Sequence, residues 1–162
     1  MRYVLKQKFF TVVGSKFRIQ NEAGEDFFFV DGTGFLTHKL SFQDMAGNEL
    51  AFIQQKPTWG AATYEIYRRG ALCAVMKQKF FTIARCRFMI DVPGPDDLEA
   101  VGSLSGMEYS FTRRGQTVAL VSAKWFSWAD TYGVDIADGE DDILILACAV
   151  VIDVVLADSK DT

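Results

Sequence analysis

An apolar segment near the end of the chain restricts the folds that the chain can adopt. The segment "ILILACAVVIDVVLA" runs from Ile143 to Ala157, and Asp153 is its one charged residue. Its fifteen residues are fewer than the roughly 20 that a helix needs to cross a bilayer. A helix that is apolar on every side has to be buried on every side. We therefore predict a central helix over about residues 140–158. Four acidic residues lead into it, as suits the positive end of a helix dipole: Asp138, Glu140, Asp141 and Asp142.

A β-barrel is the architecture that can enclose such a helix. A sandwich of two sheets cannot surround it, and a barrel of about eight strands is filled by its own side chains. A barrel of about twelve strands could enclose a helix, whose diameter is about 10–12 Å. The central helix therefore predicts a large closed barrel.

An internal repeat supplies the strands for that barrel. The hexapeptide "KQKFFT" occurs at Lys6–Thr11 and again at Lys77–Thr82. Further along, "GNELAFIQQK" aligns with "GQTVALVSAK", and "TYEI" aligns with "TYGV". A small deletion between these blocks reconciles their offsets. We therefore predict one domain over residues 1–162, built from two similar halves of about residues 1–70 and 71–138.

Each half has the pattern of an all-β unit. Runs rich in Phe, Val, Ile and Tyr alternate with turn signals such as "NEAG", "DGTG", "MAGN" and "RRG". About six strands per half are expected, and regular short strands of this kind favour a sandwich or barrel. The predicted fold is therefore mainly β, a closed barrel of about twelve strands around a buried C-terminal helix.

The chain also resembles a known family, LURP-one-related (LOR), and looks like one of its bacterial stand-alone members. The residues that carry the match are "YVLKQKFF", "LSFQDMAGNELAFIQQK", "TYEIY" and "KWFSWADTYGVDIADGEDD". The resemblance implies a tubby-like fold, a twelve-stranded barrel around a hydrophobic helix, in a superfamily that also contains the phospholipid scramblases. Tubby proteins bind phosphoinositides through basic side chains, but no tubby motif here carries those residues over. A shared fold does not transfer function.

Composition and the scarcity of reactive groups argue against several function classes. The formal net charge of −4 disfavours a dedicated nucleic-acid binder. His38 is the only histidine and has no neighbouring nucleophile in a recognisable motif. Cys73, Cys86 and Cys148 have no metal-binding spacing and are expected as reduced core thiols. We therefore predict a protein without enzymatic activity, cofactor or metal. No signal peptide is predicted at the N-terminus, which favours a cytoplasmic protein, peripheral to the membrane rather than transmembrane.

Four lysines of the repeated strand are the first candidate binding residues. Alternation along a strand places Lys6 and Lys8 on one face and Leu5 on the other, and Lys77 and Lys79 repeat this arrangement. Such lysines could form basic stripes that attract anionic lipid headgroups. Solvated lysines that discourage aggregation are the alternative interpretation.

Aromatic residues in "KWFSWAD" are the second candidate. Trp125, Phe126 and Trp128 lie where a strand gives way to a loop, and they could enter a membrane interface or contact a partner. Alternatively, they could fold over the end of the barrel and plug it, because Trp59 lies in the corresponding connection of the first half.

The predicted function is that of a non-catalytic binding module. Its expected ligand is an anionic phospholipid headgroup or another phosphorylated ligand at a membrane surface. The alternative is a scaffold for protein–protein interaction without a small-molecule ligand. Lysines clustered on one surface would favour the first hypothesis, and dispersed lysines would favour the second. A pocket near Asp153 with convergent polar groups would instead favour a small-molecule hydrolase.

Overall fold

The computed structural model describes residues 1–11, 14–33, 37–79, 86–103, 107–126 and 131–160. These residues form twelve strands and one helix. The elements are β1 (Arg2–Thr11), β2 (Gly14–Asn21), β3 (Asp26–Thr33), β4 (Lys39–Asp44), β5 (Glu49–Lys56), β6 (Thr63–Arg68), β7 (Ala71–Lys79), β8 (Cys86–Asp91), β9 (Leu98–Ser103), β10 (Glu108–Arg113), β11 (Gln116–Ser122), β12 (Thr131–Ile136) and α1 (Asp142–Lys160).

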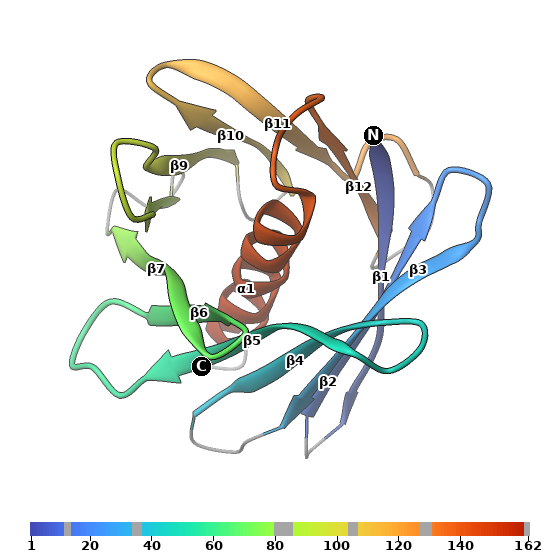
Figure 1. Cartoon of the computed structure of the whole chain (residues 1–162), viewed down its shortest axis with the longest axis horizontal. Coiled ribbons are helices and arrows are strands. Elements are labelled where there is room, and N and C mark those ends of the chain that lie inside the picture. Colours follow the sequence, from blue (N-terminus) through green and yellow to red (C-terminus); the bar gives the residue numbers. More distant parts are fainter. Residues whose placement is uncertain (12–13, 34–36, 80–85, 104–106, 127–130, 161–162) are drawn as a thin grey trace.

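The strands form the closed barrel that the sequence predicts (Figure 1). Each strand pairs with its neighbours in the chain, and β1 pairs with β12 to close the sheet. Every neighbouring pair is antiparallel, so alternate strands run in the same direction. Two tight turns with positive φ at both central residues, Arg69-Gly70 and Arg114-Gly115, connect β6 to β7 and β10 to β11. Such turns match the twist of the strands that they join.

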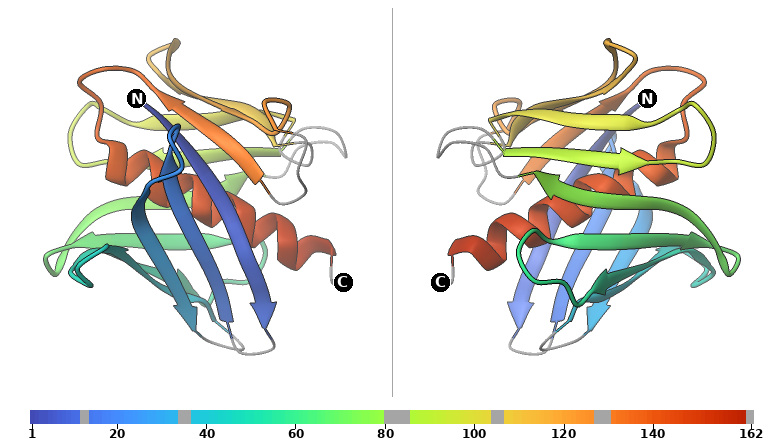
Figure 2. Two further views of the ribbon diagram at one scale, coloured as in Figure 1. Left: turned by 90° about the vertical axis from the view of Figure 1, so that its right-hand side faces the viewer. Right: turned by 90° about the vertical axis from the view of Figure 1, so that its left-hand side faces the viewer.

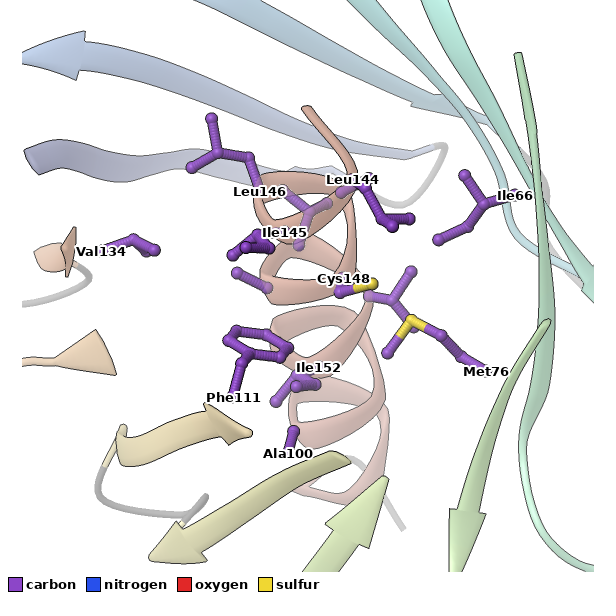
Figure 3. Packing of buried hydrophobic residues seen from close by; sticks show 14 of the residues in the cluster. Ile66, Met76, Ala100, Phe111, Val134, Leu144, Ile145, Leu146, Cys148 and Ile152 are labelled. Atoms are coloured by element: carbon purple, nitrogen blue, oxygen red, sulfur yellow. The ribbon is translucent and has the colours of Figure 1, made fainter. Parts of the chain in front are cut away.

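Helix α1 runs through the inside of the barrel (Figures 1 and 2). Val150, Val151 and Ile152 in its middle are fully buried. The strands turn apolar side chains toward it, and Ile66, Met76, Ala100 and Phe111 lie around the helix in Figure 3. The predicted central helix is confirmed, with both ends two residues further along the chain than expected. The surface of α1 can be apolar on every side because the barrel wall surrounds the helix.

Two ends of the barrel can be distinguished by the direction of α1. We call the end at which α1 begins the base, and the end at which it finishes the mouth (Figure 2). Because β12 leads into α1 at the base, odd-numbered strands run from base to mouth and even-numbered strands run back. Odd-numbered strands therefore end at the mouth, and the described connection between β5 and β6 lies there.

The acidic residues before α1 fasten the helix at the base. Asp141 caps α1 by accepting the backbone N–H of Leu144 at 3.2 Å. The same aspartate pairs with Arg68, and Glu140 accepts two hydrogen bonds from Arg113, each 2.8 Å long. Two strands on different sides of the barrel thus hold the segment that leads into the helix. These residues serve the helix N-terminus, as the sequence predicts.

Candidate functional site

The candidate lysines of the repeat lie on opposite sides of the barrel. Strands β1 and β7 are separated by five strands in both directions around the barrel. Lys77 and Lys79 on β7 are exposed, and Lys6 on β1 is partly buried. The backbone of Lys8 is placed on β1, but its side chain lies outside the described part of the structure. The four lysines therefore do not form a patch on one side wall, and by itself this dispersal around the barrel favours the protein-interaction alternative.

The lysines share an end of the barrel instead. Strands β1 and β7 both run from base to mouth, and the repeated lysines lie in their middle or second halves. Lys6, the lysine farthest from the mouth, is level with Thr131, the first residue of β12. Every lysine that precedes α1 lies toward the mouth: Lys6, Lys8, Lys16, Lys39, Lys56, Lys77, Lys79 and Lys124. We call these eight residues the lysine rim.

Acidic residues are concentrated at the other end. The turns at the base and the segment that leads into α1 carry Glu22, Glu25, Asp44, Asp96, Asp97 and Glu140, among others. In the described part of the chain, the acidic residues toward the mouth are Asp31, Glu65, Glu108, Asp153 and Asp158. The net charge of −4 therefore conceals a separation of charge along the barrel axis. A basic end with an acidic base orients the protein in an external field and on a charged surface.

Part of the lysine rim is paired with carboxylates. Lys56 Nζ lies 3.2 Å from Glu65 Oε1. Arg87, which is directly opposite Lys79 in the pairing of β7 with β8, contacts Glu99. Exposed pairs of this kind are weak and exchange readily with solvent or a ligand.

The aromatic residues that the structure describes, Trp59, Trp125 and Phe126, do not plug the barrel, which corrects one of the two expectations for them. Trp59, in the connection between β5 and β6 at the mouth, is fully exposed. Trp125 lies against the outer wall, where a Cβ added to Gly133 would meet its ring at 2.5 Å. The Arg2 guanidinium covers this ring at 4.2 Å. Phe126 packs beside Trp125 over Gly133, because the glycine leaves a bare stretch of the outer strand surface. Trp128 lies outside the described residues, and contact with a membrane or partner stays a prediction.

A cavity of about 700 Å³ opens at the mouth between α1 and strands β5 to β7. Its polar lining includes Gln55, Tyr64, Gln78 and Asp158, and Lys56 also lines it. On each of these strands, every second residue is on the inner face, and the buried apolar residues mark that face. The positions in step with them include Gln55, Tyr64 and Gln78, so these three residues belong to the inner face of the barrel. The inner face thus changes from apolar to polar where the strands reach the mouth.

Hydrogen bonds tie this polar layer to α1. His38 Nε2 lies 2.8 Å from Asp158 Oδ2, and the backbone N–H of His38 donates to Gln55 Oε1 at 3.0 Å. Tyr64 is fully buried, and its hydroxyl has no hydrogen-bond partner among the described residues. Burial and the nearby Asp158 carboxylate raise the pKa of Tyr64 well above its usual value, so the phenol keeps its proton.

The signal for these cavity residues was present in the repeat. Gln7 and Gln78 occupy equivalent positions in the two copies of "KQKFFT", on the strand face opposite to the lysines. On β7, Gln78 lies on the inner face beyond the buried Met76 and marks the level at which the apolar lumen ends. No comparable sequence pattern predicts Tyr64 and His38 as cavity residues. They lie close to Asp158 only because α1 extends that far through the barrel.

Asp153 is separate from the cavity. It is partly exposed and accepts a hydrogen bond from the Tyr132 hydroxyl at 3.2 Å. Burial, with a contribution from Asp153, raises the pKa of both Tyr109 and Tyr132 far above the usual value. The sequence predicted a polar partner or a position at the barrel mouth for this acid, and the structure supplies the partner. The residues that line the mouth cavity do not include Asp153.

Comparison with known proteins places this barrel in a family. The family model described as LURP-one-related matches residues 1–153. The chain belongs to the LURP-one-related family. A 33% identical protein of Bacillus subtilis (strain 168), "Uncharacterized protein YxjI", aligns over 159 residues, which is 97% of this chain and 94% of that protein. No solved structure matches the chain. The family resemblance noted in the sequence is thus confirmed.

Two further features bear on what this LURP-one-related chain can bind. Among the residues that the structure describes, no helix has the length and apolar character required to cross a membrane. The same residues contain no group of three His, Cys, Asp or Glu side chains arranged to hold a metal ion. The mouth carries the lysine rim, an exposed tryptophan and a polar cavity, and on these features it is the strongest candidate for a binding site.

Proposed function

We propose that this LURP-one-related protein is a non-catalytic binding module that docks mouth-first on membranes rich in anionic phospholipid. The separation of charge along the barrel axis is the observation that carries the proposal. Lysines of β1 and β7 lie on opposite walls, so no side-on contact engages both groups. An end-on contact brings the lysines nearest the ends of the strands to the same surface, whereas Lys6 lies farther from it on β1. The acidic base then points away from the lipid.

The expected electrostatic gain is sufficient for reversible attachment. A lysine close to an anionic membrane surface contributes about 1 kcal/mol, and this attraction falls off within a Debye length of about 10 Å. The base lies beyond that distance in a mouth-first orientation, since one eight-residue strand spans roughly 26 Å. The acidic residues there therefore weaken binding little.

Trp59 supports the same orientation. Its side chain is fully exposed at the mouth, in the connection between β5 and β6. Tryptophan is favoured at the interface between lipid and water, because its ring is amphipathic. Mouth-first docking places this residue at the headgroup level, next to Lys56 of the rim.

Sedimentation with liposomes of increasing anionic lipid content tests the proposal. The fourfold variant Lys6→Gln, Lys8→Gln, Lys77→Gln and Lys79→Gln removes charge at the mouth. We expect it to weaken binding at low salt by up to about 4 kcal/mol, close to a thousandfold in partition coefficient. Binding of the wild type should also weaken at physiological salt.

A matched control removes positive charge at the base. Arg69 and Arg114 lie in the two tight turns there, and replacing both by Gln lowers the net charge without touching the lysine rim. Binding by this control should stay within about threefold of the wild type, because the base faces away from the membrane. Equal losses in the two variants would refute mouth-first docking. Absence of binding by the wild type at low salt would refute the membrane role and favour a protein partner.

A further inference from the structure

We propose that the mouth cavity binds a zwitterionic phosphate ester of a primary amino alcohol. The ammonium group would lie beside Asp158 and Tyr64, and the phosphate would lie beside Lys56. This inference deepens the proposed membrane role, since it names the headgroup chemistry that the mouth accepts. It rests on the geometry and charge of the cavity.

The cavity has the size and character of a small-molecule site. Its volume of about 700 Å³ falls within the range of roughly 300–1,000 Å³ for such sites. Pro57, Ala62 and Val155 supply apolar wall that suits the methylene groups of an amino alcohol. The polar lining comes from Gln55 of β5, Tyr64 of β6, Gln78 of β7 and Asp158 near the end of α1.

One side of the cavity favours a cation. Asp158 contributes a half-exposed carboxylate, and the hydrogen bond from His38 orients one of its oxygens. Helix α1 finishes close to this residue, and the C-terminal end of a helix carries partial negative charge. Both effects stabilise an ammonium group beside Asp158.

Tyr64 is the side chain that lacks a partner. It is fully buried, lines the cavity, and its hydroxyl has no hydrogen bond to the described residues. Buried hydroxyl groups in folded proteins are normally hydrogen-bonded. An ammonium group between Asp158 and Tyr64 would donate to the carboxylate and to the phenol oxygen. A primary amine has the N–H groups to do so, whereas a trimethylammonium group has none.

Another side of the cavity favours an anion. Lys56 lines the cavity, its side chain is as exposed as that of Asp158, and its ammonium group pairs with Glu65 at 3.2 Å. The cavity lining therefore carries one negative and one positive side chain. A zwitterion with its amine at Asp158 and its phosphate at Lys56 matches both signs.

Calorimetric titration with soluble phosphoethanolamine tests the inference without any membrane. We expect saturable binding, and we expect phosphocholine to bind at least about tenfold more weakly. Asp158→Asn should weaken the binding of phosphoethanolamine by a similar factor. No saturable binding of phosphoethanolamine, either free or in vesicles, would overturn the inference. Equal binding of phosphocholine or of inorganic phosphate would also overturn it.

Two tyrosine variants separate ligand binding from folding. Tyr64→Phe removes the unpartnered hydroxyl in the cavity. Tyr109→Phe removes another buried hydroxyl that has no partner among the described residues, but Tyr109 does not line the mouth cavity. We expect Tyr64→Phe to weaken phosphoethanolamine binding at least about tenfold with its melting temperature retained, and Tyr109→Phe to leave binding unchanged. The same effect in both variants would contradict the assigned site.

Vesicles distinguish the source of the ligand. Vesicles of phosphatidylglycerol with and without phosphatidylethanolamine are compared for wild type and Tyr64→Phe. If vesicle binding increases with phosphatidylethanolamine and depends on Tyr64, the ligand is a lipid headgroup. If only soluble phosphoethanolamine binds, the ligand is a free small molecule. Either outcome supports the site. The fourfold lysine variant keeps Lys56, so it should lose vesicle binding but retain soluble phosphoethanolamine. Its failure to lose vesicle binding would contradict the docking proposal alone.

Discussion

The enclosure of α1 by the barrel predicts a severe effect from one charge at the centre of the helix. Val151 is fully buried, as are Val150 and Ile152 on either side of it. Asp153, two residues further on, is partly exposed and bonded to Tyr132. Val150 and Ile152, on either side of position 151, are apolar and offer no side-chain hydrogen bond to a carboxyl group introduced by Val151→Asp. The change therefore tests whether the lumen is closed.

The expected loss of folding stability has two parts. Val151→Ala removes two buried methyl-sized groups and leaves a small cavity, at a cost of about 2 kcal/mol. Val151→Asp loses a similar apolar contribution and in addition buries an unpaired carboxyl group, which costs several kcal/mol. A domain of this kind is stable by about 5–15 kcal/mol. We therefore expect Val151→Asp to lose much of the stability of the protein and Val151→Ala to remain folded.

Urea unfolding followed by circular dichroism measures both variants. Burial raises the pKa of the new carboxyl group, so the folded state holds its proton more strongly than the unfolded state. Its stability should therefore decrease as the pH rises from about 4 to 8, while Val151→Ala shows no added pH dependence. A Val151→Asp protein within about 1 kcal/mol of Val151→Ala at pH 8 would refute the enclosed helix.

Three other outcomes follow from the described contacts. Gly133→Val should displace Trp125, since the new Cβ would lie 2.5 Å from the ring. Urea unfolding should show a loss of about 1–3 kcal/mol in the free energy of unfolding, and the near-ultraviolet circular dichroism spectrum should change. Arg113→Gln should cost roughly 1 kcal/mol through Glu140, whereas Arg114→Gln should cost no measurable stability, because its contact with Asp96 is long and exposed. Burial raises the pKa of Tyr109 and Tyr132, so the folded state keeps protons that the unfolded state loses above about pH 10. The free energy of unfolding should therefore decrease above about pH 10. Replacing both tyrosines by Phe should make this decrease smaller.

The sequence was sufficient to predict the barrel and its central helix because both depend on local patterns. The fifteen-residue apolar run between Ile143 and Ala157 could be satisfied only by enclosure, and the repeat supplied enough strands. Alternation along a strand placed Leu5 inward and Lys6 outward, and the structure agrees. The ends of α1 moved by two residues, since Asp141 caps the helix one position before it begins.

The candidate site could be predicted only in part, because it depends on how distant segments meet when the barrel closes. The lysines of β1 and β7 share an end of the barrel only through the parallel directions of these two strands. The position of Trp125 on the outer wall depends on the bare surface at Gly133. The cavity at Tyr64 depends on where α1 stops, and no residue pattern in the strand itself reports that point.

The orientation on the membrane is measured most directly by the depth of individual tryptophans. Brominated phospholipids quench tryptophan that reaches the lipid. The chain has three tryptophans, so all proteins compared carry Trp128→Phe, and two further variants in that background identify the residue responsible. Trp59 is fully exposed at the mouth, whereas Trp125 lies on the side wall under Arg2. Mouth-first docking predicts that Trp59→Phe removes most of the quenching on anionic vesicles and that Trp125→Phe leaves it intact. Quenching that persists in Trp59→Phe and disappears in Trp125→Phe would show side-on binding and contradict the account.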